Sequence, residues 1–204
     1  MHPALNDEKV GEKLLYYLAK YIFLIYFLIF NRVKVDGLEN IPERGGIIIC
    51  PNHIHWLDPI LVGVYTKRKI HYMAKAEAFK NKLFAFVLRN IYAFPVKRGT
   101  PDISAIKTSL KIVKNGKCLG IFPEGHRSEN GKLQKAEPGV ALISLKSKTP
   151  VIPVRITGSY KPFSKLKITI GKPISFLKYS GKKLSMDEIN KLSQLIMKEI
   201  SELA

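Results

Sequence analysis

The stretch that decides the fold spans residues 47–59 and reads IIICPNHIHWLDP. It opens with four apolar residues, Ile47 to Cys50, a pattern typical of a strand buried on both faces. It ends with Asp58 and Pro59, which indicate a helix start because aspartate caps helix N-termini and proline fits the first turn. A polar loop with two histidines joins them. This order predicts an α/β fold, in which reactive groups lie in loops at the carboxyl ends of strands.

The same alternation continues on both sides of this stretch. Residues 166–170 alternate in polarity, which indicates a strand near an edge of the sheet. Because strands alternate with helices, we expect an α/β domain with a mixed, largely parallel sheet flanked by helices. The other expected strands are residues 32–36, 70–73, 92–96, 118–122 and 151–156, and the expected helices are 58–65, 77–90, 100 or 102 to 115, 138–146 and 186–203.

The N-terminal segment from Leu14 to Phe30 reads LLYYLAKYIFLIYFLIF, with Lys20 as its single charge. As a helix it reaches about 25 Å, against a bilayer core of about 30 Å. Its first half is typical of an interfacial helix, and its second half of a helix buried more deeply. The alternative is a helix in a protein core. We favour a membrane-anchoring helix over residues 1–31, followed by a globular domain over residues 32–204.

The charge balance indicates an anionic partner. The chain of 204 residues has 34 Lys and Arg against 16 Asp and Glu, a net charge of +18 with neutral histidines. Nucleic acid, an anionic membrane surface and phosphorylated substrates fit this excess. No nucleic-acid-binding motif accompanies the charge, so we expect no specific nucleic acid, and the apolar N-terminus favours the membrane. Cys50 and Cys118 both lie in apolar strands, which predicts free core thiols rather than a disulfide.

The loop after residue 51 holds a candidate catalytic pair, His53 and Asp58. On a continuous helix the two side chains would point about 140° apart, so they meet only if a turn lies between them. Asp58 would then bind one ring nitrogen of His53 and leave the other to take a proton. The alternative is a loop histidine beside a helix-capping aspartate. His53 and His55 lack the further ligands of a metal site, so none is predicted.

Charged residues follow three other strands. Residues 122–128 read FPEGHRS, in which Glu124 suits hydroxyl groups, Gly125 permits close approach of the backbone, and Arg127 offers a planar fork for phosphate. Lys75 ends one strand and Arg98 follows another, and both suit an anionic ligand. The alternatives are a polar turn with a local Glu–Arg pair and solvated surface charge.

These segments together resemble the 1-acylglycerol-3-phosphate acyltransferase (lysophosphatidic acid acyltransferase) family of glycerolipid acyltransferases, over roughly residues 33–172. Asn52, His53 and Asp58 match its Asn-His-x4-Asp motif, and the other three motifs match in order at residues 94–98, 122–128 and 151–154. His126 stands where the family usually has threonine. The apolar N-terminal segment is single here, whereas family members often have two membrane-associated segments.

The resemblance implies the glycerolipid acyltransferase fold and the transfer of a fatty acyl group to the sn-2 hydroxyl of 1-acylglycerol 3-phosphate. The product would be phosphatidic acid for phospholipid biosynthesis, made at the cytoplasmic face of the cell membrane. Acyl-CoA or acyl carrier protein would be the co-substrate, with no cofactor. The alternatives are another acceptor, such as glycerol 3-phosphate or another lysophospholipid, and a non-catalytic membrane-surface lipid-binding protein.

The resemblance also implies a role for each site residue. His53 would be the general base that deprotonates the acceptor hydroxyl, and Asp58 would orient it, with Asn52 in support. Lys75 and backbone amides near Val154 would stabilise the oxyanion. The remaining assignments are phosphate binding by Arg98 and Arg127 and glycerol binding by Glu124 and Gly125.

Overall fold

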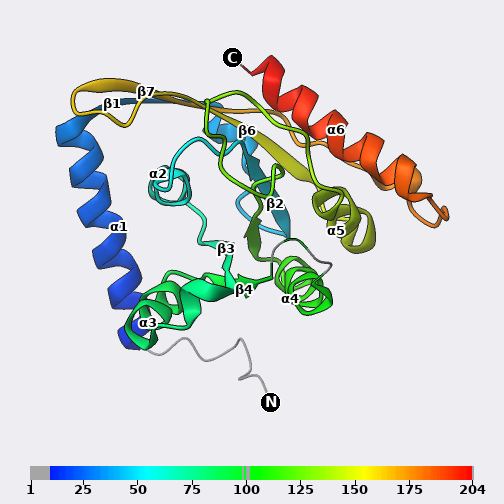
Figure 1. The fold of residues 1–204 in the computed structure, drawn as a ribbon, viewed down its shortest axis with the longest axis horizontal. Coiled ribbons are helices and arrows are strands. Elements are labelled where there is room, and N and C mark those ends of the chain that lie inside the picture. Colours follow the sequence, from blue (N-terminus) through cyan, green and yellow to red (C-terminus); the bar gives the residue numbers. More distant parts are fainter. Residues whose placement is uncertain (1–9, 98, 100–101, 204) are drawn as a thin grey trace.

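The structure, a computed structural model, describes residues 10–97, 99 and 102–203, with side chains from Leu14 onward. Strands and helices alternate along most of the chain (Figure 1). The strands are β1 (Asn31–Asp36), β2 (Ile47–Pro51), β3 (Ile70–Lys75), β4 (Phe94–Val96), β5 (Cys118–Gly120), β6 (Val151–Gly158) and β7 (Ser164–Ile170). The α-helices are α1 (Val10–Phe30), α2 (Asp58–Tyr65), α3 (Lys82–Asn90), α4 (Ile103–Lys114), α5 (Gly139–Ser147) and α6 (Met186–Glu202).

The strands form one sheet in the order β1-β7-β6-β2-β5-β3-β4. The five strands from β6 to β4 are mutually parallel, whereas β7 runs antiparallel to β6 and pairs in parallel with β1. The predicted mixed, largely parallel sheet is therefore confirmed. Because five strands share one direction, the loops that follow them meet at a single edge of the sheet.

The apolar run of β2 is buried on both faces, as its sequence predicts. Ile47 and Ile49 pack in one core cluster with residues of α1 and α2. Ile48 and Cys50 pack in a second cluster with residues of α4, α5 and α6. Alternate residues of a strand point to opposite faces, so β2 fills both interiors at once. Figure 1 shows α4, α5 and α6 on one side of the sheet and α1 and α2 on the other.

Two local expectations differ from the structure. The single helix expected over residues 77–90 is a 3-10 helix, η2 (Ala76–Phe79), followed by α3, because Asn81 caps α3 by accepting from the Phe84 amide at 3.0 Å. The strand expected over residues 118–122 ends at Gly120. Strand β7 lies near the edge of the sheet, as expected, with β1 pairing along its outer side.

Helix α1 has a buried face and an apolar exposed face. Phe27 is fully buried, whereas Leu18, Ile22 and Ile25 each expose more than half of their surface. The buried face packs on α2. Lys20, the single charge of the apolar run, turns inward and donates to the Thr66 carbonyl at 2.7 Å. One face of α1 thus belongs to the protein core, and the opposite face is an exposed apolar surface. None of the described helices combines the length and apolar character needed to cross a bilayer.

The two thiols are free and buried, as predicted. Burial disfavours the charged thiolate, so it raises the pKa of Cys118 to about 12 and that of Cys50 well above its ordinary value. Because the thiolate is the reactive form, we expect the folded protein to resist a disulfide exchange reagent at pH 8. Guanidinium unfolding should expose two equivalents of thiol. Rapid labelling of the native protein would contradict the buried placement.

Candidate active site

The loop between β2 and α2 is held by the side chain of Asn52. Its Oδ1 accepts from the Ile156 amide at 2.7 Å, and its Nδ2 donates to the Ile156 carbonyl at 3.1 Å. The Asn52 amide also donates to the Val154 carbonyl. Asn52 therefore extends the pairing of β2 with β6 by one residue and sets the point at which the chain leaves the sheet.

The next residue, His53, lies against Asp58 at the first turn of α2. The His53 Nδ1 and the Asp58 Oδ2 are 2.8 Å apart. Asp58 is fully buried, and 10% of the His53 side chain is exposed. An ionised carboxylate only accepts, so Nδ1 carries the proton and Nε2 holds a free lone pair in the neutral ring. The turn at residues 54–57 brings together two side chains that a continuous helix would separate.

Asp58 does not cap α2. Its Oδ2 accepts from the backbone amides of Ile54 and His55 as well as from His53, each amide at 2.7 Å. Its Oδ1 accepts from the Tyr160 hydroxyl at 2.5 Å. A buried carboxylate is costly unless donors surround it, and here four donors do. The alternative of a capping aspartate beside an unrelated histidine does not fit this geometry.

The loop after β5 fixes the backbone of His53. The His53 amide donates to Glu124 Oε1 at 2.8 Å, and the His53 carbonyl accepts from the Ser128 amide at 2.8 Å. The imidazole ring stacks on Phe122 with centroids 4.0 Å apart. Both the ring and the backbone of the candidate base are thus held before any substrate arrives.

Glu124 binds protein backbone on both of its oxygens. Its Oε2 accepts from the Gln134 amide at 3.1 Å, while Oε1 is bound to His53. Burial raises the pKa of Glu124, and the hydrogen bonds from the His53 and Gln134 amides lower it. The carboxylate joins the loops after β2 and β5, a role that its residue type alone does not reveal. Glycerol binding by Glu124 stays a prediction.

Gly125 and Arg127 lie in the turn that follows. Gly125 has a φ of +72°, in the left-handed region that favours glycine, and its amide donates to the Phe122 carbonyl. Arg127 is exposed, and its charge reaches His55. Burial lowers the pKa of His55, Asp58 raises it, and Arg127 lowers it again. The charge of Arg127 therefore acts on His55, which lies in the same loop as His53.

The other predicted residues occupy the same edge of the sheet or lie outside the described residues. Lys75 is the last residue of β3, and its side chain is exposed. Val154 is buried in β6 beside Pro51. Arg98 lies outside the described residues. Among the described residues, the hydrogen bonds that join Asn52, His53, Asp58 and Glu124 include neither Lys75 nor Arg127.

Tyr160 is a site residue that sequence reasoning missed. It lies in the loop after β6 and binds Asp58 across 102 residues of sequence. Tyr160 follows a buried parallel strand, and the same position after a strand identified the loops that carry the other candidate residues. The described residues contain no cluster of three or more His, Cys, Asp or Glu side chains placed to hold a metal ion.

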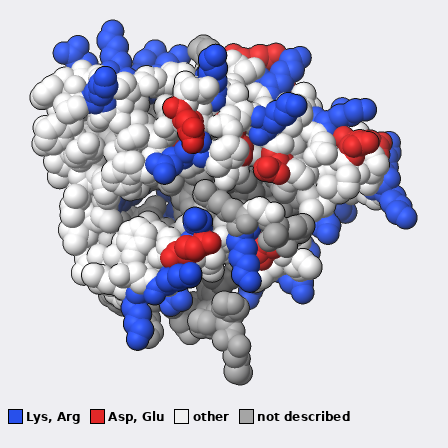
Figure 2. Space-filling model, in the orientation of Figure 1, with Lys and Arg blue, Asp and Glu red and all other residues white. Residues whose placement is uncertain are grey.

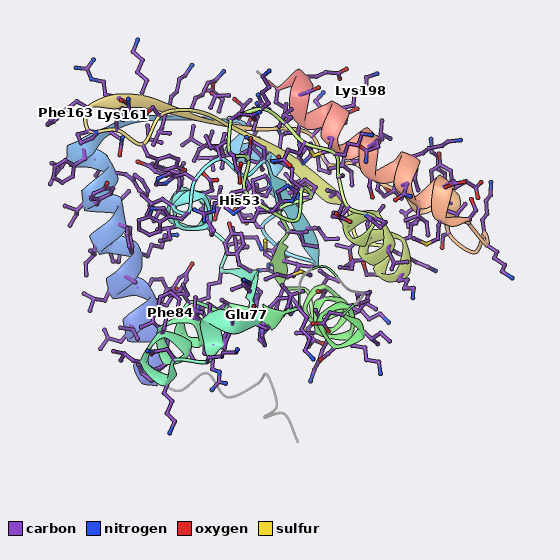
Figure 3. All side chains as sticks on the ribbon, viewed as in Figure 1. His53, Glu77, Phe84, Lys161, Phe163 and Lys198 are labelled. Atoms are coloured by element: carbon purple, nitrogen blue, oxygen red, sulfur yellow. The ribbon has the colours of Figure 1, made fainter. Side chains whose placement is uncertain are left out.

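This arrangement is suited to removing a proton from a bound hydroxyl. A histidine with Nδ1 bound to a buried carboxylate presents Nε2 as the acceptor, and the carboxylate stabilises the imidazolium that forms. Figure 3 shows His53 near the centre of the molecule, in the loop region between the two sets of helices. Lys75 and Arg127 also follow strands at this edge of the sheet, where α/β proteins usually bind their ligands.

Comparison with known proteins identifies the family. The acyltransferase family model matches residues 32–157. The 1-acyl-sn-glycerol-3-phosphate acyltransferase of Bacillus subtilis is 41% identical over 149 residues, covering 70% of this chain and 73% of that protein. The enzyme of the same name from Streptococcus pneumoniae is 32% identical over 160 residues, covering 75% of this chain and 59% of that protein.

A solved structure shares the fold. The crystal structure of the 1-acyl-sn-glycerophosphate (LPA) acyltransferase from Thermotoga maritima matches with a TM-score of 0.73 at 24% sequence identity, covering 98% of this chain and 83% of that chain. The family match spans the strands and loops that carry His53, Asp58, Glu124 and Arg127. The chain therefore belongs to the acyltransferase family and is an acyltransferase.

Proposed function

We propose that this acyltransferase moves a fatty acyl group from acyl-CoA or acyl carrier protein to the sn-2 hydroxyl of 1-acylglycerol 3-phosphate, giving phosphatidic acid for phospholipid biosynthesis. The observation that carries the proposal is the 2.8 Å contact between His53 Nδ1 and the fully buried Asp58 Oδ2, which leaves Nε2 as a base. The names of the relatives from Bacillus subtilis and Streptococcus pneumoniae support the choice of acceptor.

The proposed reaction is a single acyl transfer. His53 Nε2 takes the proton of the acceptor hydroxyl as its oxygen attacks the thioester carbonyl. The tetrahedral intermediate collapses, the carbon–sulfur bond breaks, and the departing thiolate takes the proton from the imidazolium. Asp58 orients His53 and stabilises its positive charge. The thioester is already activated, so the transfer needs no cofactor. The proton removed from the acceptor hydroxyl ends on the released thiol, so atoms and electrons balance.

The negative charges of the substrates need cations and donors. Lys75 and amides near Val154 are the proposed stabilisers of the oxyanion, since fixed donors contribute most where charge develops. Arg127, with Arg98, is proposed to hold the acceptor phosphate through bidentate hydrogen bonds. The exposed guanidinium of Arg127, whose charge reaches His55 beside the dyad, supports this assignment.

We propose that α1 anchors the protein in one leaflet at the cytoplasmic face of the membrane, ahead of the catalytic domain over residues 32–204. The exposed apolar face of α1 supports this placement, since a continuous apolar surface of this kind marks a membrane or protein contact. Lys20 is turned away from that face, which leaves its described outer residues uncharged. The face comprises Leu14, Tyr17, Leu18, Tyr21, Ile22, Ile25, Leu28, Ile29 and Phe30.

Apolar side chains continue this surface at both ends of α1. Phe163 packs on Phe30 with ring centroids 6.4 Å apart, and α3 packs near the start of α1. Leu83 and Phe84 of α3 are 76% and 52% exposed. Figure 3 shows Phe163 and Phe84 toward opposite ends of α1. The exposed apolar surface thus runs along the described part of α1, from Leu14 to Phe30.

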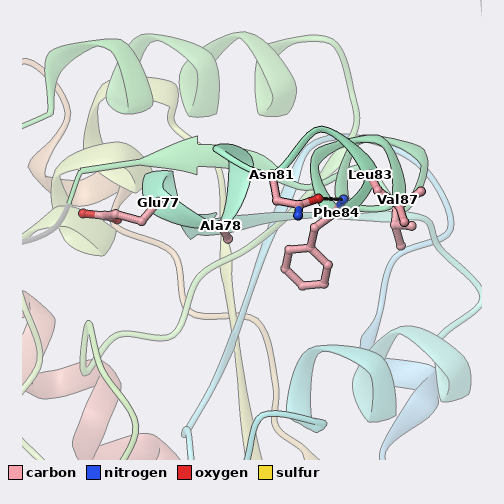
Figure 4. Close-up of a pocket in the computed structure, with 6 residues that line it drawn as sticks. All are labelled: Glu77, Ala78, Asn81, Leu83, Phe84 and Val87. Atoms are coloured by element: carbon pink, nitrogen blue, oxygen red, sulfur yellow. Dashed lines mark hydrogen bonds between the residues drawn. The ribbon is translucent and has the colours of Figure 1, made fainter.

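A hollow of about 570 Å³ lies beside α3 and η2. Its lining is mostly apolar and includes Phe84 and Val87, which Figure 4 shows projecting from the same side of the helix. The Asn81 cap fixes the first turn of α3 and so the direction of Phe84. These side chains are suited to lie among lipid acyl chains.

The charge distribution fits an anionic bilayer. Figure 2 shows a largely uncharged surface over α1, with Lys and Arg side chains above it near β1 and β7 and below it near α3. Each basic residue close to an anionic leaflet contributes about 1 kcal/mol of binding. The Lys and Arg side chains at the two ends of α1 would contact lipid headgroups while the apolar face of α1 enters the leaflet.

Replacement of either dyad residue should remove most turnover. His53→Ala removes the base, and Asp58→Asn replaces an accepting oxygen with a donor, so the His53 ring is left in the wrong tautomer. We expect kcat to fall by about two to four orders of magnitude. The assay is thiol release from a long-chain acyl-CoA with 1-acylglycerol 3-phosphate, with glycerol 3-phosphate and with no acceptor.

The acceptor series separates the proposed activity from its alternatives. Release that requires 1-acylglycerol 3-phosphate supports the proposal, and release that requires glycerol 3-phosphate instead assigns a different acceptor. If neither acceptor supports release from acyl-CoA, the series is repeated with acyl carrier protein as donor. Wild-type rates from His53→Ala would reject the proposed base, and inactivity with every donor and acceptor would reject the proposed activity.

Arg127→Ala should raise the KM for the acceptor about tenfold, because one charge-assisted contact to phosphate is lost. The KM for the acyl donor should stay unchanged. Arg44→Ala is a matched control, since Arg44 is also exposed but precedes β2, at the opposite end of that strand. An effect of Arg127→Ala confined to the acyl donor would place this arginine at the donor site instead.

Charges placed on the outer face of α1 should weaken vesicle binding. The double variant Ile22→Glu/Ile25→Glu alters side chains that are each 55% exposed, so the core face of α1 is untouched. We expect at least a tenfold loss of binding to anionic vesicles in a sedimentation assay, since a charge in lipid costs about 2 kcal/mol or more.

A matched control separates membrane insertion from net charge. Ile103→Glu/Met186→Glu makes the same change at exposed apolar residues of α4 and at the start of α6, across the sheet from α1. It should lower binding only slightly. Equal losses in the two double variants would show that net charge, rather than the α1 face, governs binding.

A further inference from the structure

Tyr160 contacts the dyad from outside the matched family region, which ends at residue 157. It lies in the loop between β6 and β7. Its hydroxyl donates to Asp58 Oδ1 at 2.5 Å, while Asp58 Oδ2 takes His53 and two backbone amides. Each carboxylate oxygen therefore has its own donors. Among the described residues, Tyr160 is the side chain that donates to Oδ1, whereas His53 binds Oδ2.

Aromatic packing fixes the ring of Tyr160. On one side it stacks on His55 with centroids 4.2 Å apart and planes 17° apart. Phe27 of α1 also packs against it, with centroids 6.4 Å apart. Phe27 is fully buried, so the ring is held by the inner face of α1 and by the loop that carries the dyad. A ring held in this way presents its hydroxyl in one direction.

The hydroxyl of Tyr160 is a permanent donor. Burial raises its pKa far above the ordinary value, and the charge of Asp58 and the hydrogen bond between them raise it further. Both effects favour the protonated phenol. The group therefore donates to Asp58 throughout the pH range in which His53 works as a base.

We propose that Tyr160 is a positioning residue of the catalytic dyad, which holds the Asp58 carboxylate in the plane that directs Oδ2 to His53 Nδ1. This role rests on the proposed function of His53 as the base. A hydrogen bond to one oxygen restrains rotation of the carboxylate about its last torsion and also withdraws part of its negative charge. Tyr160 thus sets both the direction and the strength of the contact between Asp58 and His53.

The direction in which loss of the Tyr160 hydroxyl moves the pH profile of kcat/KM can be predicted. Without this donor the carboxylate carries more negative charge and stabilises the His53 imidazolium more strongly. His53 then keeps its proton to a higher pH, so the acid limb of the kcat/KM profile moves upward. The other titratable groups that act on the dyad are Tyr72 from β3, His55 from the same loop and Glu124 from the loop after β5. Arg127 acts on His55.

The test compares Tyr160→Phe with Tyr65→Phe. Tyr65 of α2 also packs on Phe27, with centroids 6.4 Å apart, but it is not bonded to Asp58. We expect Tyr160→Phe to lower kcat about tenfold, as loss of one hydrogen bond to a charged group does. The acid limb should move to higher pH while the KM for the acceptor stays constant. Tyr65→Phe should keep the wild-type profile.

A second readout does not depend on turnover. The Nδ1 proton between His53 and Asp58 should give a low-field ¹H resonance, which His53→Gln removes. In Tyr160→Phe it should move further downfield, because the carboxylate becomes a stronger acceptor. Tyr160→3-fluorotyrosine has nearly the same shape and a hydroxyl that is a stronger donor. It should move the resonance upfield and the acid limb to lower pH, opposite to the shifts expected for Tyr160→Phe. This variant provides the test if Tyr160→Phe fails to fold.

The outcomes separate this proposal from the proposed function. A folded Tyr160→Phe protein with the wild-type acid limb and resonance would overturn the positioning role. A fall in kcat with neither of these shifts would show a merely structural effect and would also overturn it. If wild-type protein transfers no acyl group to any acceptor, the proposed function fails, and the resonance alone then decides whether Tyr160 controls the Asp58–His53 contact.

Discussion

The rest of the site depends on one constraint, the burial of a single carboxylate. Asp58 is fully buried, and an unpaired charge there would cost several kcal/mol. Its four donors come from the His53 ring, the amides of Ile54 and His55, and the Tyr160 hydroxyl. The loop before α2 has to turn so that its amides face Asp58, and the same turn brings His53 into place. The position of His53 therefore follows from the need to surround the buried Asp58 carboxylate with hydrogen-bond donors.

The parallel sheet supplies the second part of the arrangement. Because β2, β5 and β6 run in the same direction, the loops that follow them meet at one edge and can bind one another. Asn52 joins the loop after β2 to β6, and Glu124 joins it to the loop after β5. These contacts join buried polar groups to one another across loops, which makes a rigid site. As the proposed base, His53 is held so firmly that it would lose little freedom when a substrate binds.

Sequence patterns predicted the features that depend on residues close together in the chain. The apolar run of β2 indicated a strand buried on both faces, and the spacing of His53 and Asp58 indicated a turn between them. Contacts between distant segments left no such pattern. Tyr160 lies 102 residues beyond Asp58, and the use of both Glu124 oxygens by backbone amides depends on two loops meeting in space. The break before α3 was missed because an Asn81 cap outweighed the helical periodicity around it.

Helix α1 has two faces with different surroundings. Its outer face is apolar, while its inner face places Phe27 against Tyr160. Protein interiors are close-packed, so a shift of a buried aromatic ring displaces its neighbours. A movement of α1 relative to the sheet would pass through Phe27 to the Tyr160 ring, and from its hydroxyl to the Asp58 carboxylate. The helix that is proposed to meet the lipid is therefore also part of the wall that holds His53 and Asp58, so its sequence would have to suit the bilayer and the candidate site together.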